Sequence, residues 1–506
     1  MIHLSFYEAI LLLSVKFWIF WHLFILFYAI ILSLEREAAI MIHKHITEQT
    51  AIFFSVSKWV FLSSVIGVII GSVVTLFLNI LAYAEDSRSL LPFDYYYLLP
   101  LGLVLTVWLV NTFAPSAEGH GTEKVIAAVH KSDGKINISV IPIKLLATVI
   151  SIFAGASVGK EGPGAQIGAG VASALSDLFK FNKHDRKKLV ICGISAGFAT
   201  VFGTPVAGAI FGVEVLIIGV ILYDVLLPSF IAGFAAFTTA QFLGIDYTYY
   251  NLHFYQSISL DIWLIAKVVL AALFFGIVSD IVITTVSFTA KIIKKIPFNS
   301  YVKAFGGGII IVILTLIFGQ EYIGLGLGII HNTINPDPLY AVDIHWYTFL
   351  LKTLFTSLSL GSGGSGGIIT PIFYIGATSG HTFGALFSPE HLVLFSALGF
   401  VSVLSATTNT PIASTIMAVE LFGLDIAHYA ALAAVISFLI SGHRSIFSSQ
   451  ILAMKKSEML AVKIGEEVEN ITADLEDAQK SKIDRLKDRL HIKRELLKNR
   501  KRGKKN

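Results

Sequence analysis

Glu161 is the residue whose type and setting suggest chemistry most directly, because its carboxylate lies between two glycines in GKEGP at residues 159–163. Pro163 predicts a helix that begins near Gly162, since proline is tolerated in the first turn of a helix. A helix start offers unpaired N–H groups and partial positive charge, which bind anions. The carboxylate would compete with that anion until it is protonated. We therefore expect Glu161 to be a gate coupled to pH; the alternative is a carboxylate that only caps its own helix.

A second helix start is expected near Thr370, in GIITP at residues 367–371, after a glycine-rich stretch at residues 361–367. Partial charges at two helix starts would hold an anion loosely enough for rapid release, which favours permeation. Lys144 and Lys352 would add positive potential on the approaches to this site. The alternative for both lysines is that they mark helix ends and extend to the membrane surface.

An internal repeat relates the two motifs. Shifting the sequence by 208 residues places Gly159 on Gly367 and Pro163 on Pro371, and a shift of 206 places TPVAGAIFGVE, which starts at Thr204, on TPIASTIMAVE. Two homologous halves with broken helices are typical of repeat-built transporters, whose substrate site lies near the middle of the membrane. The sequence leaves open whether the halves are parallel or inverted.

The composition is that of an integral membrane protein. Of 506 residues 55% are hydrophobic and only 14% are charged, with a mean hydropathy of +0.75. A soluble enzyme, a disordered scaffold and a nucleic-acid-binding domain are therefore poor explanations. The single cysteine, Cys192, and the absence of an HExxH pattern argue against a metal site. No paired nucleophile and base occurs within the repeated motifs, so we expect no enzyme activity.

The membrane segments are expected to be helices, because their apolar runs are continuous and do not alternate with period two. Two segments, residues 162–178 and Pro411–Phe422, are too short to cross a bilayer of roughly 30 Å and should be half-helices buried in protein. Longer apolar runs occur at residues 7–33, 55–84, 97–113, 141–158, 188–202, 215–244, 259–291, 303–318, 345–360, 389–405 and 427–441.

The chain is expected to divide into four parts. These are an extra hydrophobic helix with a cytoplasmic linker at 1–50, a first repeat at 51–250, a second repeat at 251–459 and a charged tail at 460–506. Alternatively, Met41 is the true start. Residues 480–506 carry 13 Lys/Arg against 3 Asp/Glu, which places the tail in the cytoplasm by the positive-inside rule. Nucleic-acid binding is the rival interpretation of this tail, but no nucleic-acid partner is expected.

The motifs resemble those of the CLC family of chloride channels and chloride/proton exchangers, over about residues 55–459. GKEGP is similar to the family's GREGP motif, GIITP to its GxFxP motif, and GHGTE at residues 119–123 to its GSGIP motif. The resemblance implies an all-α polytopic membrane protein with inverted repeats, whose half-helices meet at a midplane anion site. It also implies a homodimer in the bilayer, in the bacterial inner membrane, without a cofactor and with chloride as the transported ion. Only about 45 residues follow this core, so the family's cytoplasmic CBS domains are not expected.

The resemblance also assigns roles to residues. Glu161 corresponds to the gating glutamate, and the anion would meet the backbone amides around Lys160 and Gly162 and those of Ile368 and Ile369.

Two expected hydroxyl groups are absent from the anion site. His120 stands where the family usually has a serine, and Phe447 where it usually has a tyrosine. An imidazole N–H could donate to the anion in place of the serine, although His120 could also be a capping or core residue. Selectivity for fluoride or nitrate is therefore an open variant.

Val215 indicates a channel. The family's exchangers often carry a proton-relaying glutamate at this position, next to Glu214, and valine cannot relay a proton. We expect a chloride channel gated by Glu161, with Glu214 in a structural role because Glu420 matches it in the second half. The alternative is a chloride/proton antiporter in which water or another inner acid carries protons.

Overall fold

The fold is seen in a computed structural model, which describes residues 18, 21–23, 39–250, 261–336, 343–471 and 474–475. Most of the apolar run at 7–33 and the whole basic segment 480–506 lie outside the described residues. The chain divides into two compact units, residues 1–61 and 62–506, and the anion site lies within the second.

Helices dominate the described part, as the continuous apolar runs predict. In the first half they are α2 (Ala39–Asp86), α3 (Leu99–Phe113), α4 (Thr122–Lys131), α5 (Val140–Phe153), α6 (Glu161–Leu178), α7 (Lys183–Phe202), α8 (Pro205–Glu214) and α9 (Tyr223–Phe242). In the second half they are α10 (Ile262–Lys295), α11 (Ser300–Phe318), α12 (Leu327–Ile334), α13 (Thr348–Gly361), α14 (Ile369–Phe387), α15 (Leu392–Thr408), α16 (Pro411–Phe422) and α17 (Ala427–Ile440).

Short elements join these helices. Two-residue strands pair in parallel between β1 (Ile217–Ile218) and β2 (Ile451–Leu452), and in antiparallel fashion between β3 (Leu460–Ala461) and β4 (Asp474–Leu475). Single 3-10 turns occur at Ser87–Leu90, Tyr95–Leu98, Pro115–Ala117, Gln320–Tyr322, Pro389–His391, Leu424–Ile426 and Val468–Asn470.

Six helical stretches of the described part are long and apolar enough to cross a membrane: Thr47–Leu90, Tyr95–Phe113, Tyr223–Phe242, Ile262–Lys295, Ser300–Phe318 and Pro389–Thr408. The apolar runs at 141–158, 345–360 and 427–441 form α5, α13 and α17, which have only 14 residues each. A helix of this length spans about 21 Å and cannot cross the hydrocarbon core alone. Each of these helices must therefore have at least one end within the membrane, where other parts of the protein bury it.

The helix α2 is longer than the apolar run at 55–84. It runs unbroken for 48 residues from Ala39 and includes the end of the segment expected as a linker. No glycine or proline interrupts the sequence before Gly67, so nothing in the chain stops the helix.

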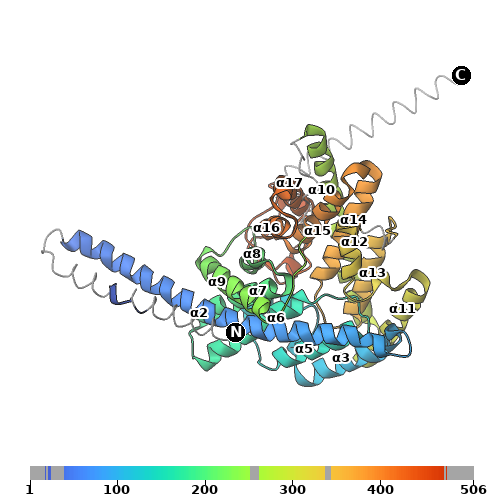
Figure 1. Cartoon of the computed structure of the whole chain (residues 1–506), viewed down its shortest axis with the longest axis horizontal. Coiled ribbons are helices and arrows are strands. Elements are labelled where there is room, and N and C mark those ends of the chain that lie inside the picture. The colour runs from blue at the N-terminus through green and yellow to red at the C-terminus, as the bar shows by residue number, and fades with distance from the viewer. Residues whose placement is uncertain are drawn as a thin grey trace, which may run out of the picture. The chain divides into compact units, whose positions relative to one another are not determined.

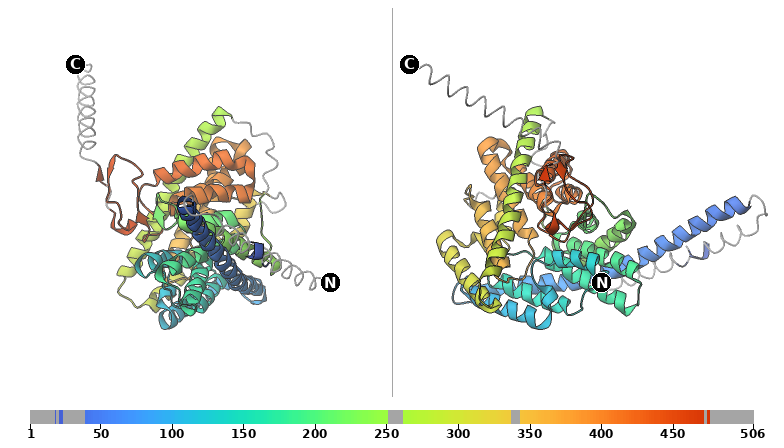
Figure 2. Two further views of the ribbon diagram at one scale, coloured as in Figure 1. Left: turned by 90° about the vertical axis from the view of Figure 1, so that its left-hand side faces the viewer. Right: turned by 180° about the vertical axis from the view of Figure 1, so that it is seen from behind.

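The two half-helices of the site pack on their neighbours through glycines. A Cβ on Gly168 of α6 would lie 2.4 Å from the carbonyl oxygen of Gly193 in α7, and a Cβ on Gly376 of α14 would lie 2.4 Å from that of Gly399 in α15. Small residues allow such close backbone approach in membrane helices. The pairs α6–α7, in turquoise and green, and α14–α15, in orange, can be followed in Figures 1 and 2. Both repeats thus bury a half-helix in the same way.

Candidate anion site

The helix starts of the two repeats meet at a pair of equivalent glycines. The Gly159 N–H donates to the Gly367 carbonyl at 2.6 Å, and the Gly367 N–H donates to the Gly159 carbonyl at 2.5 Å. Just beyond Gly159 the helix α6 begins at Glu161, and just beyond Gly367 the helix α14 begins at Ile369. The predicted starts near Gly162 and Thr370 are therefore confirmed, and they lie against each other.

Serine side chains form a second reciprocal pair of hydrogen bonds between the two repeats. The Ser157 N–H donates to the Ser359 hydroxyl at 2.9 Å, and the Ser365 N–H donates to the Ser151 hydroxyl at 3.0 Å. Ser157 matches Ser365, and Ser151 matches Ser359, at the repeat distance of 208 residues. The two segments before the helix starts are thus held by the same bonds in both directions.

Glu161 reaches across to the second repeat. Its side chain is buried, with 1% exposed, and its carboxylate accepts hydrogen bonds from the Thr370 N–H at 3.0 Å and from the Thr370 hydroxyl. The carboxylate therefore occupies the start of α14, where the sequence predicts an anion. Thr370 was expected only as part of a helix start; its equivalence to Gly162 in the repeat gave no signal for this contact.

The amides expected to face the anion lie at the two helix caps. Lys160 and Ile368 are the N-cap residues of α6 and α14, and Gly162 and Ile369 lie in the first turns. Neither N-cap side chain accepts a hydrogen bond from its helix.

His120 and Phe447 lie together beside this site. Their ring centroids are 5.6 Å apart, and the Phe447 side chain is fully buried. The backbone of His120 touches α6, because a Cβ on Gly162 would lie 2.0 Å from the His120 carbonyl oxygen. Within the described part of the chain the Nδ1 atom of His120 is buried without a hydrogen-bond partner. An unpaired nitrogen in this place leaves a group that can meet an anion or water.

Lys144 and Lys352 take equivalent places in the two repeats, and both side chains are fully buried. The Lys144 ammonium donates to the carbonyls of Ala117, at 3.1 Å, and Gly119. The Lys352 ammonium donates at 3.1 and 3.0 Å to the carbonyls of Tyr322 and Gly324. Both charges thus lie inside the protein and fix the loop before a short helix, α4 in one repeat and α12 in the other.

Glu214 caps a helix of the opposite repeat. Its carboxylate accepts from the N–H groups of Ile412, at 3.0 Å, and Ala413, at 2.8 Å, at the start of α16. Glu420 does the same at the start of α8, with the N–H groups of Val206 and Ala207 at 3.0 and 2.8 Å. Such bonds satisfy the otherwise unpaired amides of a helix start.

Val215 follows this cap and is fully buried. Its carbonyl accepts from the Gln450 side-chain amide at 2.6 Å, which ties it to the segment that carries Phe447. No charged side chain stands at this position.

Two cavities flank the helix starts. One, of about 350 Å³, is lined by Lys160, Glu161, Thr370, Tyr247 and His331, among others. The Glu161 side chain is therefore part of its wall.

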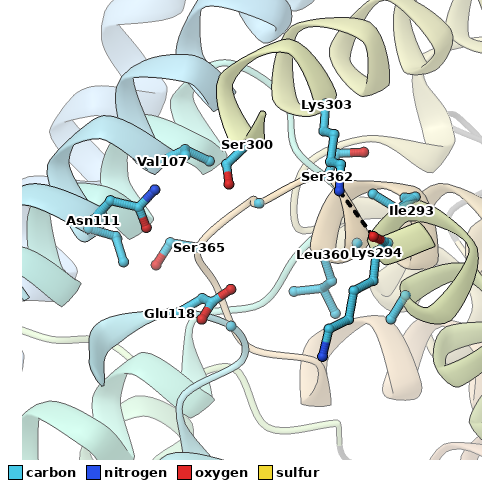
Figure 3. A pocket seen from close by; sticks show the side chains of 15 residues that line it. Val107, Asn111, Glu118, Ile293, Lys294, Ser300, Lys303, Leu360, Ser362 and Ser365 are labelled. Carbon is cyan, nitrogen blue, oxygen red and sulfur yellow. Dashed lines mark hydrogen bonds between the residues drawn. The ribbon is translucent and has the colours of Figure 1, made fainter. Parts of the chain in front are cut away.

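The other cavity, of about 380 Å³, is lined by Glu118, Gly119 and Ser365, which lie just before His120 and Gly367 in the sequence. Lys294 and Lys303 line it as well, and Lys303 Nζ donates to the Lys294 carbonyl at 3.2 Å (Figure 3). The described residues contain no group of three His, Cys, Asp or Glu side chains that could hold a metal ion.

Comparisons with known proteins agree with this architecture. The family model of the voltage gated chloride channel matches residues 101–442. A chloride/fluoride channel protein of Pseudomonas syringae pv. tomato is 34% identical over 412 residues, which cover 80% of this chain and 88% of the relative. The H(+)/Cl(-) exchange transporter ClcA of Vibrio campbellii is 26% identical over 399 residues, which cover 71% of this chain and 81% of the relative.

Solved structures give the same result. The crystal structure of a CLC-type fluoride/proton antiporter superposes with a TM-score of 0.73 at 30% identity, covering 79% of this chain and 99% of the other. With its two matched repeats and with the family model covering residues 101–442, the chain belongs to the voltage gated chloride channel family, the CLC family of membrane anion transporters.

Proposed function

We propose that this protein exchanges fluoride or chloride for protons across the membrane, with Glu161 as the gate. The observation that carries the proposal is the Glu161 carboxylate bonded to the amide and hydroxyl of Thr370 at the start of α14. An anion that takes this place must displace the carboxylate, and protonation of Glu161 releases it. Anion and proton therefore use the same site in turn, which is the basis of an exchange.

The similar proteins support fluoride as a substrate, because both the Pseudomonas syringae relative and the superposed antiporter carry fluoride in their names. The donors near the Glu161 carboxylate are compatible with this anion. They comprise helix-start amides and the Thr370 hydroxyl, with the unpaired His120 nitrogen nearby. Fluoride is the strongest hydrogen-bond acceptor among the halides, so direct N–H and O–H donors offset the loss of its hydration shell best.

A passive channel is the second candidate, and Val215 favours it. This buried side chain offers no group that could bind a proton. A channel with the same gate would pass the anion down its gradient without moving protons against theirs.

Proteoliposomes distinguish the two candidates. With the membrane potential clamped by an ionophore, we expect an imposed fluoride gradient to drive protons uphill, and we expect Glu161→Gln to abolish this movement. Anion flux of the wild type without uphill proton movement would establish the channel and reject the exchange. Repeating the assay with chloride identifies the preferred anion.

The protein is a multi-pass integral membrane protein, and its bacterial relatives indicate the inner membrane.

We also propose a homodimer, as the family resemblance implies. Light scattering of the detergent-solubilised protein should then give twice the chain mass of 55.1 kDa after subtraction of the detergent. A protein mass of one chain would contradict this.

A further inference from the structure

The proposed exchange requires a group that takes up protons on the side of the site away from Glu161. Val215 cannot serve, so the candidates are the other glutamates that are at least partly buried in the pore-forming helices. Glu161, Glu214 and Glu420 each have both carboxylate oxygens engaged by hydrogen bonds. Glu123 in the first turn of α4 is different, and it is the carboxylate on which this inference rests.

One carboxylate oxygen of Glu123 accepts three hydrogen bonds, and the other accepts none among the described residues. Oε1 accepts from the Ser448 hydroxyl at 3.0 Å, from the Ser449 N–H at 2.9 Å and from the Ser449 hydroxyl. Oε2 is buried and has no hydrogen-bond partner among the described residues. A buried polar atom without a partner is costly unless water or a proton satisfies it. The carboxylate is thus held in a fixed place by Oε1 and left with an open proton acceptor at Oε2.

Glu123 is bonded to a segment that contacts both Val215 and His120. Ser449, which holds the carboxylate, directly precedes Gln450, whose side chain bonds the Val215 carbonyl. His120 lies just before α4, and its ring centroid is 5.6 Å from that of Phe447, two residues before Ser449. His120 also has an unpaired buried nitrogen, and its carbonyl touches Gly162, next to Glu161.

We propose that Glu123 is the inner proton acceptor of the exchange and that His120 passes the proton on to Glu161. This inference rests on the proposed function. Oε2 of Glu123 binds a proton from the cytoplasm, and the imidazole of His120 takes this proton and releases it through water onto the Glu161 carboxylate. Each transfer breaks one bond to the proton and forms another. The protonated Glu161 then leaves Thr370, and an anion takes its place.

The charges around Glu123 are compatible with this role. Lys124 and Lys131 of its own helix are the nearby cations, and Lys131 is paired with Glu467 at 2.9 Å in the C-terminal segment. Glu469 of the same segment bonds the Ser448 carbonyl through its backbone N–H.

The helices packed against α4 bring little charge to Glu123, whereas the buried Lys144 of α5 brings a cation to His120, because its ammonium donates to the carbonyl of the adjacent Gly119. From α6 the neighbours of the α4 start are Gly162 and Gln166, which do not titrate. From α7, the charge of Lys187 interacts electrostatically with His130, which lies at the far end of α4. No cation bonds the free oxygen in the described structure, so it remains open to a proton.

The test measures fluoride and proton fluxes in proteoliposomes for four variants. Glu123→Gln should keep fluoride flux and lose at least tenfold in uphill proton flux. His120→Gln should lower the ratio of proton flux to fluoride flux at least tenfold, whatever the change in its fluoride flux. Gln at 120 keeps an N–H donor for the anion but cannot accept and release a proton. The double variant S448A/S449A removes the hydroxyls that hold Glu123 and keeps its carboxylate, so its proton-to-fluoride ratio should stay within twofold of the wild type. Glu118→Gln, which removes an exposed acid nearby, should also leave this ratio unchanged.

The outcomes separate this inference from the proposed function. Wild-type coupling that persists in Glu123→Gln overturns the inference and leaves the exchange intact. Loss of coupling in S448A/S449A as large as in Glu123→Gln would show that Glu123 only anchors the segment, which also overturns it. If Glu123→Gln does not fold, His120→Gln decides, because unchanged coupling there rejects the path. A wild type that moves no protons rejects both proposals.

Discussion

At the scale of single residues, the proposed exchange depends on a carboxylate and an anion that take the start of α14 in turn. Glu161 was identifiable from the sequence because an acid between glycines, before a proline, is unusual in an apolar segment. Its partner Thr370 comes from the other repeat, 209 residues away. Through this contact a pH-sensitive carboxylate occupies the N–H and hydroxyl donors of Thr370.

Substituting Glu161 tests this competition. Glu161→Gln should remove most of the pH dependence of anion flux, because an amide imitates the protonated side chain and carries no charge to compete with the anion. The measurement is fluoride and chloride efflux from liposomes between pH 4.5 and 7.5. Thr370→Val is the companion variant; it keeps the backbone donor, so a pH dependence should persist there. A Glu161→Gln protein with the wild-type pH profile would reject the gate.

His120 should determine which anions pass best. Serine at this position restores the hydroxyl that the family usually has and removes an aromatic ring that packs on Phe447. We expect His120→Ser to change the permeation order of fluoride, chloride, bromide and nitrate, because the donor and the space beside the anion both change. Competition measurements in liposomes give the order directly. An unchanged order would return His120 to a packing role.

At the scale of elements, the site depends on half-helices that are buried by protein on all sides. The sequence predicted their starts from Pro163, Pro371 and the preceding glycines. It did not predict how α6 and α14 pack, because the close approach to α7 and α15 is visible only when glycines of different helices are paired in space. Equivalent glycines do this in both repeats.

A methyl group at this interface should be costly. The Cβ in Gly376→Ala would lie 2.4 Å from the Gly399 carbonyl oxygen, which forces α14 and α15 apart. Overpacking of this kind lowers the free energy of unfolding by about 1–3 kcal/mol. The midpoint of thermal unfolding in detergent should therefore fall. Gly306→Ala in α11 is the matched control; its Cβ meets no atom within 4 Å, so stability should be unchanged or higher.

At the scale of the whole molecule, charge sets the orientation. The turn between α6 and α7 carries Lys180, and the first turn of α7 adds Lys183 and Arg186, whereas the connection after α2 has no such surplus. The positive-inside rule then places the α6–α7 turn in the cytoplasm.

Cysteine labelling tests this orientation with little background, because the single native cysteine, Cys192, is buried. Ser89 and His184 are both exposed, one after α2 and one in the first turn of α7. In intact spheroplasts a membrane-impermeant maleimide should label Ser89→Cys and leave His184→Cys unlabelled until the membrane is permeabilised. The reverse pattern would mean that the chain is inserted the other way round.

The sequence by itself determined the membrane class, the two-fold repeat, the helix starts and the family. These features are local or periodic, since proline, glycine and apolar runs act on their own segment of chain. Only the tertiary structure decided which side chains meet: Glu161 with Thr370, Glu214 with the start of α16, and Glu123 with Ser448 and Ser449. Each of these contacts joins residues nearly 200 or more positions apart, and a carboxylate in a sequence gives no sign of which helix start or hydroxyl it will satisfy. Lys144 and Lys352 show the same limit, because their matched positions were evident but their burial against loop carbonyls was not.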